Sequence, residues 1–103
     1  MQTVQPLIDQ FGNINLHMEE DLVLPLRGGE GLADLSQRQL VFRIPARSIT
    51  HVVALDPAEP TGRLIRLTAK ELRSVRTGDT FILLDTTGGG AASRWEGVIR
   101  RRA

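Results

Sequence analysis

Apolar and polar side chains alternate along four stretches of the chain, which is the spacing of a β-strand with one buried face. These stretches are residues 14–18, 21–27, 39–44 and 94–100. Proline cannot donate a ladder hydrogen bond, so Pro25 predicts that the second strand lies at a sheet edge or contains a bulge. The alternation predicts that each strand covers one side of a shared core.

Three further apolar stretches also predict strands. One expected strand runs through His51, with apolar positions at Ile49, Val53 and Leu55. Another includes residues 64–67. Residues 81–84 are Phe-Ile-Leu-Leu, a nearly continuous apolar run, which predicts a strand covered on both faces.

Turn-forming residues separate these stretches. Residues 56–62 contain Asp, Pro and Gly, and residues 86–90 read Thr-Thr-Gly-Gly-Gly, which predicts a hairpin connection. Thr68 and Glu71 have the spacing of a capping box, which predicts one short helical turn near residues 68–75. About seven short strands with turns between them are typical of an all-β sandwich or barrel.

Length and composition fit one ordinary globular domain. The chain has 103 residues, of which 41% are hydrophobic and 24% charged. Residues 1–12 lack a clear period and are expected to form an N-terminal arm, followed by a β-sandwich domain at residues 13–103. No apolar run approaches the length of a membrane helix, and the first residues do not resemble a secretory signal, so we expect synthesis in a cytoplasm.

Several sequence elements occur in the order and spacing found in one family of viral domains. An Asp-Leu-Ser element precedes an alternating strand, a Gly-initiated strand ends in Leu-Thr and runs into a turn, and an aromatic strand precedes a last strand with a central glycine. These elements are residues 34–36 and 40–44, residues 62–68 with Leu72 and Gly78, Phe81, and residues 95–99. From Asp21 to Arg100 the chain resembles the small immunoglobulin-like β-sandwich domains of tailed-phage virions, such as the N-terminal domain of phage baseplate upper proteins.

This resemblance implies an immunoglobulin-like β-sandwich that serves as a structural protein of a tailed phage or phage-like particle, in the tail, baseplate or head–tail region. It implies packing in multiple copies against other virion structural proteins, a virion location, and no enzymatic activity or cofactor. The two chain ends can bury little within one domain, so we expect them to contact partners. The expected contact residues are Val4, Leu7, Ile8, Phe11, Arg100, Arg101 and Arg102.

Candidate chemistry in the sequence has simpler interpretations. His17 and His51 lie on different expected strands without patterned metal ligands, and the chain has no cysteine, so we predict no metal site. The acidic run at residues 19–21 is interpreted as a solvated charge cluster that precedes a hydrophobic strand. Trp95 shares a face with Ile99, which favours a core position over an exposed stacking platform.

Two other functions stay open at this stage. A carbohydrate-binding or adhesion sandwich would need an exposed aromatic platform, for which the sequence offers Phe11 and Trp95. A small nucleic-acid-binding barrel would need a basic surface, but the formal net charge is only +1, so neither a nucleic acid nor a membrane is expected as a partner.

Overall fold

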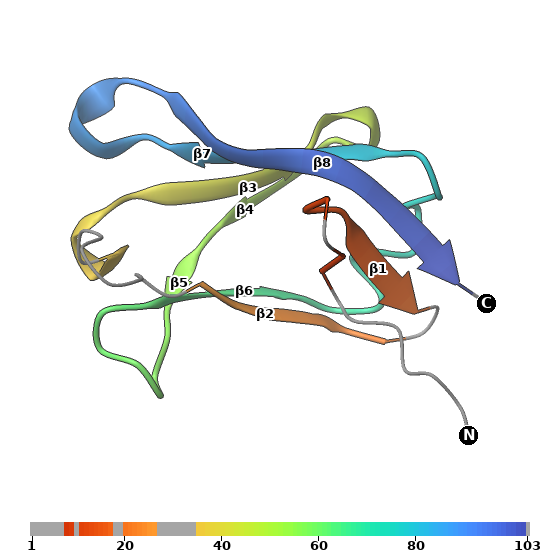
Figure 1. Ribbon diagram of the computed structural model, residues 1–103, viewed down its shortest axis with the longest axis horizontal. Coiled ribbons are helices and arrows are strands. Elements are labelled where there is room, and N and C mark those ends of the chain that lie inside the picture. The colour runs from red at the N-terminus through yellow and green to blue at the C-terminus, as the bar shows by residue number, and fades with distance from the viewer. Residues whose placement is uncertain (1–7, 10, 18–19, 27–34, 103) are drawn as a thin grey trace.

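A computed structural model describes residues 8–9, 11–17, 20–26 and 35–102, and it contains two β-sheets (Figure 1). The five-stranded sheet has the order β1-β8-β7-β3-β4, and the three-stranded sheet has the order β2-β6-β5. The strands are β1 Ile14–His17, β2 Leu22–Leu26, β3 Leu40–Ile44, β4 Ile49–Val52, β5 Ala54–Leu55, β6 Arg63–Leu67, β7 Thr80–Asp85 and β8 Ala92–Arg102. Three short 3-10 segments are η1 Leu35–Gln37, η2 Pro45–Arg47 and η3 Thr87–Gly89.

The core lies between the two sheets and takes side chains from both. Apolar residues at alternate strand positions are buried there: Ile14, Leu16, Leu22, Leu24, Leu40, Phe42, Ile44, Ile65, Leu67, Phe81, Leu83 and Ile99. The rings of Phe42 and Phe81 stack with centroids 5.6 Å apart at its centre. The predicted all-β class is therefore confirmed, with most strand pairs antiparallel and β1 parallel to β8.

Strand β2 lies at an edge of the three-stranded sheet, as Pro25 predicts. Leu22 and Leu24 are buried, whereas Val23 and Pro25 are exposed. Proline is tolerated here because one side of the strand has no ladder in the described part of the chain.

The single strand expected at residues 49–55 is wrong, because the chain changes sheets at Val53. Strand β4 pairs with β3, and β5 pairs with β6 in the other sheet. Val53 lies between them, buried, and donates its amide hydrogen to the carbonyl of Leu40 at 2.9 Å. Leu55, expected on the apolar face, is 58% exposed. This division raises the expected seven strands to eight among the described residues.

The expectation that both faces of residues 81–84 are covered is also wrong. Phe81 and Leu83 point into the core, whereas Ile82 and Leu84 are only half-buried on the outer face of the sheet. No helix or second layer lies over that outer face among the described residues, so the apolar run does not reflect a two-sided burial.

The capping box at Thr68 and Glu71 forms, but the segment after it contains turns and no assigned helix. The Thr68 amide donates to Glu71 Oε1, and the Glu71 amide donates to Thr68 Oγ1, each at 3.2 Å. One helix-like bond follows, from the Leu72 amide to the Thr68 carbonyl at 3.0 Å. Leu72 and Val75 are buried, so core contacts at these two positions fix the turns.

Candidate partner-contact surface

A compact turn at residues 9–13 precedes the first strand. The carboxylate Oδ1 of Asp9 accepts hydrogen bonds from the amides of Phe11 at 2.8 Å and Asn13 at 3.0 Å. The amide of Gly12 donates to the Asp9 carbonyl at 3.0 Å, and Gly12 has a φ of 81°, which favours glycine. The hydrogen bond with the Asn13 amide is the largest of the effects that lower the pKa of Asp9 below its ordinary value.

This turn is fixed on strand β8. The indole Nε1 of Trp95 donates to the Gly12 carbonyl at 2.8 Å, and the amide of Val98 donates to Asn13 Oδ1 at 3.1 Å. Trp95 in turn packs edge-on against Phe81, with ring centroids 4.5 Å apart. Trp95 is therefore partly buried against the core rather than a free stacking platform.

Phe11 lies at the tip of this turn and is 75% exposed. Its backbone is constrained on both sides by the Asp9 hydrogen bonds, while its ring has little contact with its own domain. A fixed backbone lowers the entropy cost of presenting an exposed side chain to a partner. Phe11 is thus an exposed aromatic side chain on a constrained backbone.

The other predicted contact residues at the N-terminus differ from Phe11. Ile8 is half-buried against the core and forms an isolated antiparallel bridge with Ile14. Its side chain is therefore largely occupied within its own domain. Val4 and Leu7 lie outside the described residues.

The C-terminal arginines also have different environments. Arg100 is exposed on β8, where it lies opposite Asn15 of β1. Arg101 instead donates from Nη1 to the carbonyl oxygens of Leu72 and Val75, so it anchors the turns at residues 69–74 to β8. Arg102 ends the strand, and its side chain lies outside the described residues.

Sequence analysis missed the residues that fix the turn at residues 9–13. Asp9, Gly12 and Asn13 are typical turn formers, so their spacing was a usable signal for a turn. Their attachment to Trp95 was not predictable, because the hydrogen bond joins residues 83 positions apart.

Charged groups away from this surface mostly form local pairs. Asp85, almost fully buried, accepts hydrogen bonds from Arg94 Nε and Nη2 at 3.2 and 2.9 Å, and Arg38 lies 3.8 Å away. Hydrogen bonds from the hydroxyl and amide of Thr87 are the main reason that the pKa of Asp85 falls to about 2. These contacts close the β7–β8 hairpin.

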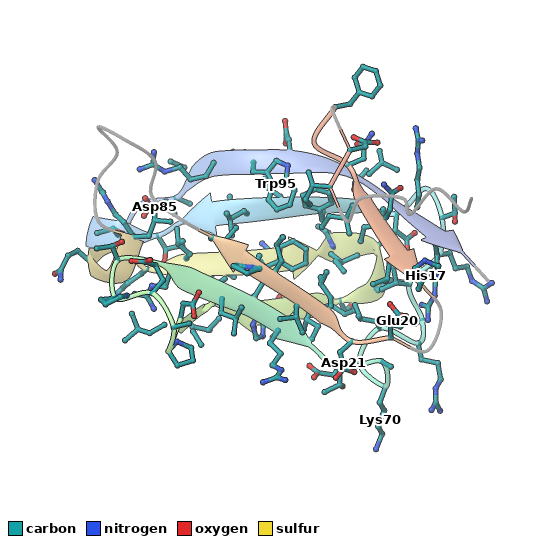
Figure 2. The ribbon with its side chains drawn as sticks, turned by 60° about the horizontal axis from the view of Figure 1, so that its bottom comes forward. His17, Glu20, Asp21, Lys70, Asp85 and Trp95 are labelled. Atoms are coloured by element: carbon teal, nitrogen blue, oxygen red, sulfur yellow. The ribbon has the colours of Figure 1, made fainter. Side chains whose placement is uncertain are left out.

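The candidate metal-binding residues do not come together. Figure 2 shows His17, Glu20 and Asp21 near one end of the molecule, beside Lys70 and far from Asp85. Asp21 Oδ1 accepts a hydrogen bond from the Ala69 amide at 2.7 Å, and His51 Nε2 accepts one from the Arg66 amide at 3.5 Å. Among the described residues there is no group of three or more His, Cys, Asp or Glu side chains suited to a metal ion.

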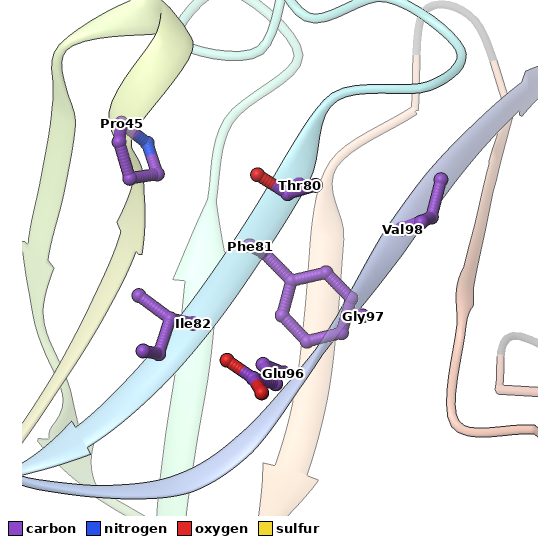
Figure 3. Close-up of a pocket in the computed structure, with 7 residues that line it drawn as sticks. All are labelled: Pro45, Thr80, Phe81, Ile82, Glu96, Gly97 and Val98. Atoms are coloured by element: carbon purple, nitrogen blue, oxygen red, sulfur yellow. The ribbon is translucent and has the colours of Figure 1, made fainter.

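One hollow of about 410 Å³ is lined by residues of β7, β8 and η2. Figure 3 shows its lining residues, which are mostly apolar: Pro45, Thr80, Phe81, Ile82, Glu96, Gly97 and Val98. Glu96 is the only charged group among them, so the hollow lacks the converging polar groups of a specific small-molecule site. In the part of the chain that is described, no helix is both long and apolar enough to cross a membrane.

Comparison with known proteins returned no matching family model, no matching curated protein and no matching solved structure.

Proposed function

We propose that this protein is a structural component of a tailed phage or phage-like particle, in the tail, baseplate or head–tail region. It acts there by packing in multiple copies against other virion structural proteins. The immunoglobulin-like assignment and the virion location are part of this proposal and rest on the sequence resemblance. The two-sheet body supplies a rigid support, and its exposed turn supplies the contact.

The observation that carries the contact role is the presentation of Phe11. Binding energy at protein interfaces is concentrated in a few residues that fill pockets on the partner, and large side chains dominate them. Phe11 is 75% exposed on a turn that Asp9 and Trp95 fix in place. Little conformational entropy is lost when such a residue binds.

Arg100 adds a second element to the same surface. Its side chain is exposed on β8 opposite Asn15, two residues after that turn, and arginine can form paired hydrogen bonds with carboxylates or stack on aromatic rings. The surface therefore suits a partner with an apolar pocket and a neighbouring acidic group. Another protein can provide both the apolar pocket and the acidic group on its surface.

The proposal is tested by complementation of a phage that lacks this gene. Wild-type protein is expected to restore particles and to be found in them by mass spectrometry, whereas Phe11→Ala is expected to be absent from purified particles. The melting temperature of the variant should stay within the error of the wild type, because the ring is mostly exposed. Val23→Ala, which alters an exposed residue of β2, is the matched control and should restore particles.

Complete particles that form without this protein would overturn the virion role. Normal incorporation of Phe11→Ala would retain that role and remove Phe11 as the contact. An adhesion module would instead show binding of a purified polysaccharide that Phe11→Ala abolishes, since Phe11 is also the one strongly exposed aromatic ring among the described residues.

A further inference from the structure

The outer face of the five-stranded sheet has no covering layer among the described residues. Apolar side chains nevertheless point to this face from four strands: Val41, Val52, Ile82, Leu84 and Val98. Val52 is 74% exposed, and the other four are half-buried. Contiguous apolar surface of this kind commonly marks a place where another protein binds.

One row across this face has opposite charges at its two ends. Arg43 of β3 lies opposite Ile82 of β7, and Ile82 lies opposite Glu96 of β8, so the three side chains point to the same side. Neighbouring strands are about 4.8 Å apart, so the two charged residues flank Ile82 at equal backbone distances. Arg43 and Glu96 are exposed, and no ion pair joins either of them to another described residue.

The next row toward η2 is apolar at both ends. Thr80 lies opposite Val98, and Pro45 lies on the other side of β7 (Figure 3). These three residues, with Ile82 and Glu96, belong to the lining of the hollow of about 410 Å³. The hollow therefore adjoins Ile82 and leaves room for side chains from a facing surface.

We propose that this face packs against the same face of a second copy of this chain, about a twofold axis that runs along β7 at Ile82. Rotation about this axis exchanges the two sides of β7. Arg43 of each copy then faces Glu96 of the other, Pro45 faces Val98, and the two Ile82 side chains meet at the centre. Sheets that pack face to face keep their strands within about 30° of each other and lie about 10 Å apart.

The charge pattern favours this axis over the other twofold arrangement of two aligned faces. An axis across the strands at Ile82 would place Arg43 opposite Arg43 and Glu96 opposite Glu96, and opposed like charges disfavour association. The axis along β7 instead forms two complementary charge pairs. Both pairs form within one closed dimer of identical copies.

Reversal of one charge tests the opposed pairs in the full-length protein. Wild-type protein is expected to be a dimer by light scattering after size exclusion. Arg43→Glu and Glu96→Arg should each weaken the dimer by about 100-fold or more, because either change opposes like charges twice. Arg66→Glu, the same change at an exposed residue of β6 in the other sheet, is the matched control and should stay dimeric.

A mixture of the two charge-reversal variants tests which residues face each other. One copy then has two acidic side chains at these positions and the other has two basic ones, so the mixture should form a dimer that neither variant forms alone. The variant with both changes, Arg43→Glu with Glu96→Arg, should also recover the dimer. Circular dichroism should show that every variant remains folded, because the two side chains are exposed.

A wild type that is monomeric at every concentration would overturn this inference and would leave the face to a different protein. Three further results would also overturn it: a dimer that both charge reversals leave intact, a mixture that stays monomeric, or equal weakening by Arg66→Glu. Loss of the dimer on deletion of residues 1–7, with Arg43→Glu still dimeric, would assign the contact to the N-terminal segment instead.

This contact uses neither Phe11 nor Arg100, and it is tested on purified protein without a particle. None of its outcomes decides whether Phe11→Ala is incorporated into particles. Failure of this inference and failure of the proposed function are therefore distinguishable.

Discussion

The indole Nε1 of Trp95 lies 2.8 Å from the carbonyl oxygen of Gly12, so the last strand directly fixes the turn that precedes the first strand. The hydrogen bond occurs where β8 and the turn also meet through Val98 and Asn13. Presentation of Phe11 therefore depends on residues near the opposite end of the chain.

Trp95→Phe is expected to lower the free energy of unfolding by about 1–2 kcal/mol, because the Gly12 carbonyl loses its partner while an aromatic ring remains. Hydrogen exchange at the amides of Phe11 and Asn13 should become faster than in the wild type. Urea unfolding and hydrogen-exchange mass spectrometry measure the two effects. Unchanged exchange at this turn would contradict the anchoring role of the indole.

Gly97→Ala tests the close approach of the same turn to β8. A Cβ atom at Gly97 would lie 3.0 Å from the Gly12 carbonyl oxygen and 3.1 Å from both Asn13 Oδ1 and Phe81 Cε1. We expect a loss of about 1–3 kcal/mol in unfolding free energy, because all three atoms belong to packed or hydrogen-bonded groups. Thermal and urea unfolding check it.

The matched control for this substitution is Gly90→Ala. Gly90 has a φ of −91°, and a Cβ atom there would meet nothing within 4 Å. Its stability should therefore change by less than about 0.5 kcal/mol. Equal losses for the two variants would indicate a general cost of removing glycine from this hairpin rather than a steric clash at Gly97.

Local pattern predicted the strands whose burial alternates, because a single face decides which residues are apolar. Leu22, Leu24, Phe42 and Ile44 lie where that pattern places them. The alternation could not predict that the chain changes sheets at Val53. Apolar residues lie on both sides of Val53, so residues 49–55 have the sequence pattern of a single strand.

The environments of the predicted contact residues were less predictable than the strands. Ile8 and Phe11 are both apolar, so composition gives the same expectation for each. Ile8 packs against the core of its own domain, whereas Phe11 is 75% exposed. Likewise Arg100 is exposed, whereas Arg101 donates to two backbone carbonyls. Contacts with residues far away in the sequence decide these differences, and such contacts cannot be predicted from a local pattern.

Acid is expected to destabilise the protein through Asp85. Its pKa is lowered from 3.8 to about 2 in the folded state, so the unfolded state binds the proton first as the pH falls. The stabilisation is complete above about pH 4 and is lost as the pH falls toward 2, with a magnitude of about 2 kcal/mol. Urea unfolding at pH 7, 4, 3 and 2 measures it.

Asp85→Asn provides the comparison for this pH dependence. The variant should be less stable at pH 7, because the ion pair with Arg94 is lost, and its stability should fall less between pH 4 and pH 2. A residual slope of the same sign is expected from Asp79, whose pKa is also lowered, mainly by hydrogen bonding with Arg47. Parallel curves for the two proteins would remove Asp85 as the cause.

Two N-terminal deletions separate the stabilising part of this region from the remainder. Deletion of residues 1–7 keeps Ile8 and Asp9 and every described contact of the turn, so the melting temperature should change little. Deletion of residues 1–10 removes the half-buried Ile8 and the carboxylate that accepts from Phe11 and Asn13. Loss of the Ile8 contact alone should cost about 1–2 kcal/mol, from the apolar area returned to water.

Ile8→Ala and Asp9→Ala in the full-length chain divide this loss between packing and turn geometry, and thermal unfolding measures all four proteins. If both deletions were equally stable, Ile8 and the Asp9 hydrogen bonds would contribute nothing measurable, and the turn would depend on Trp95 alone.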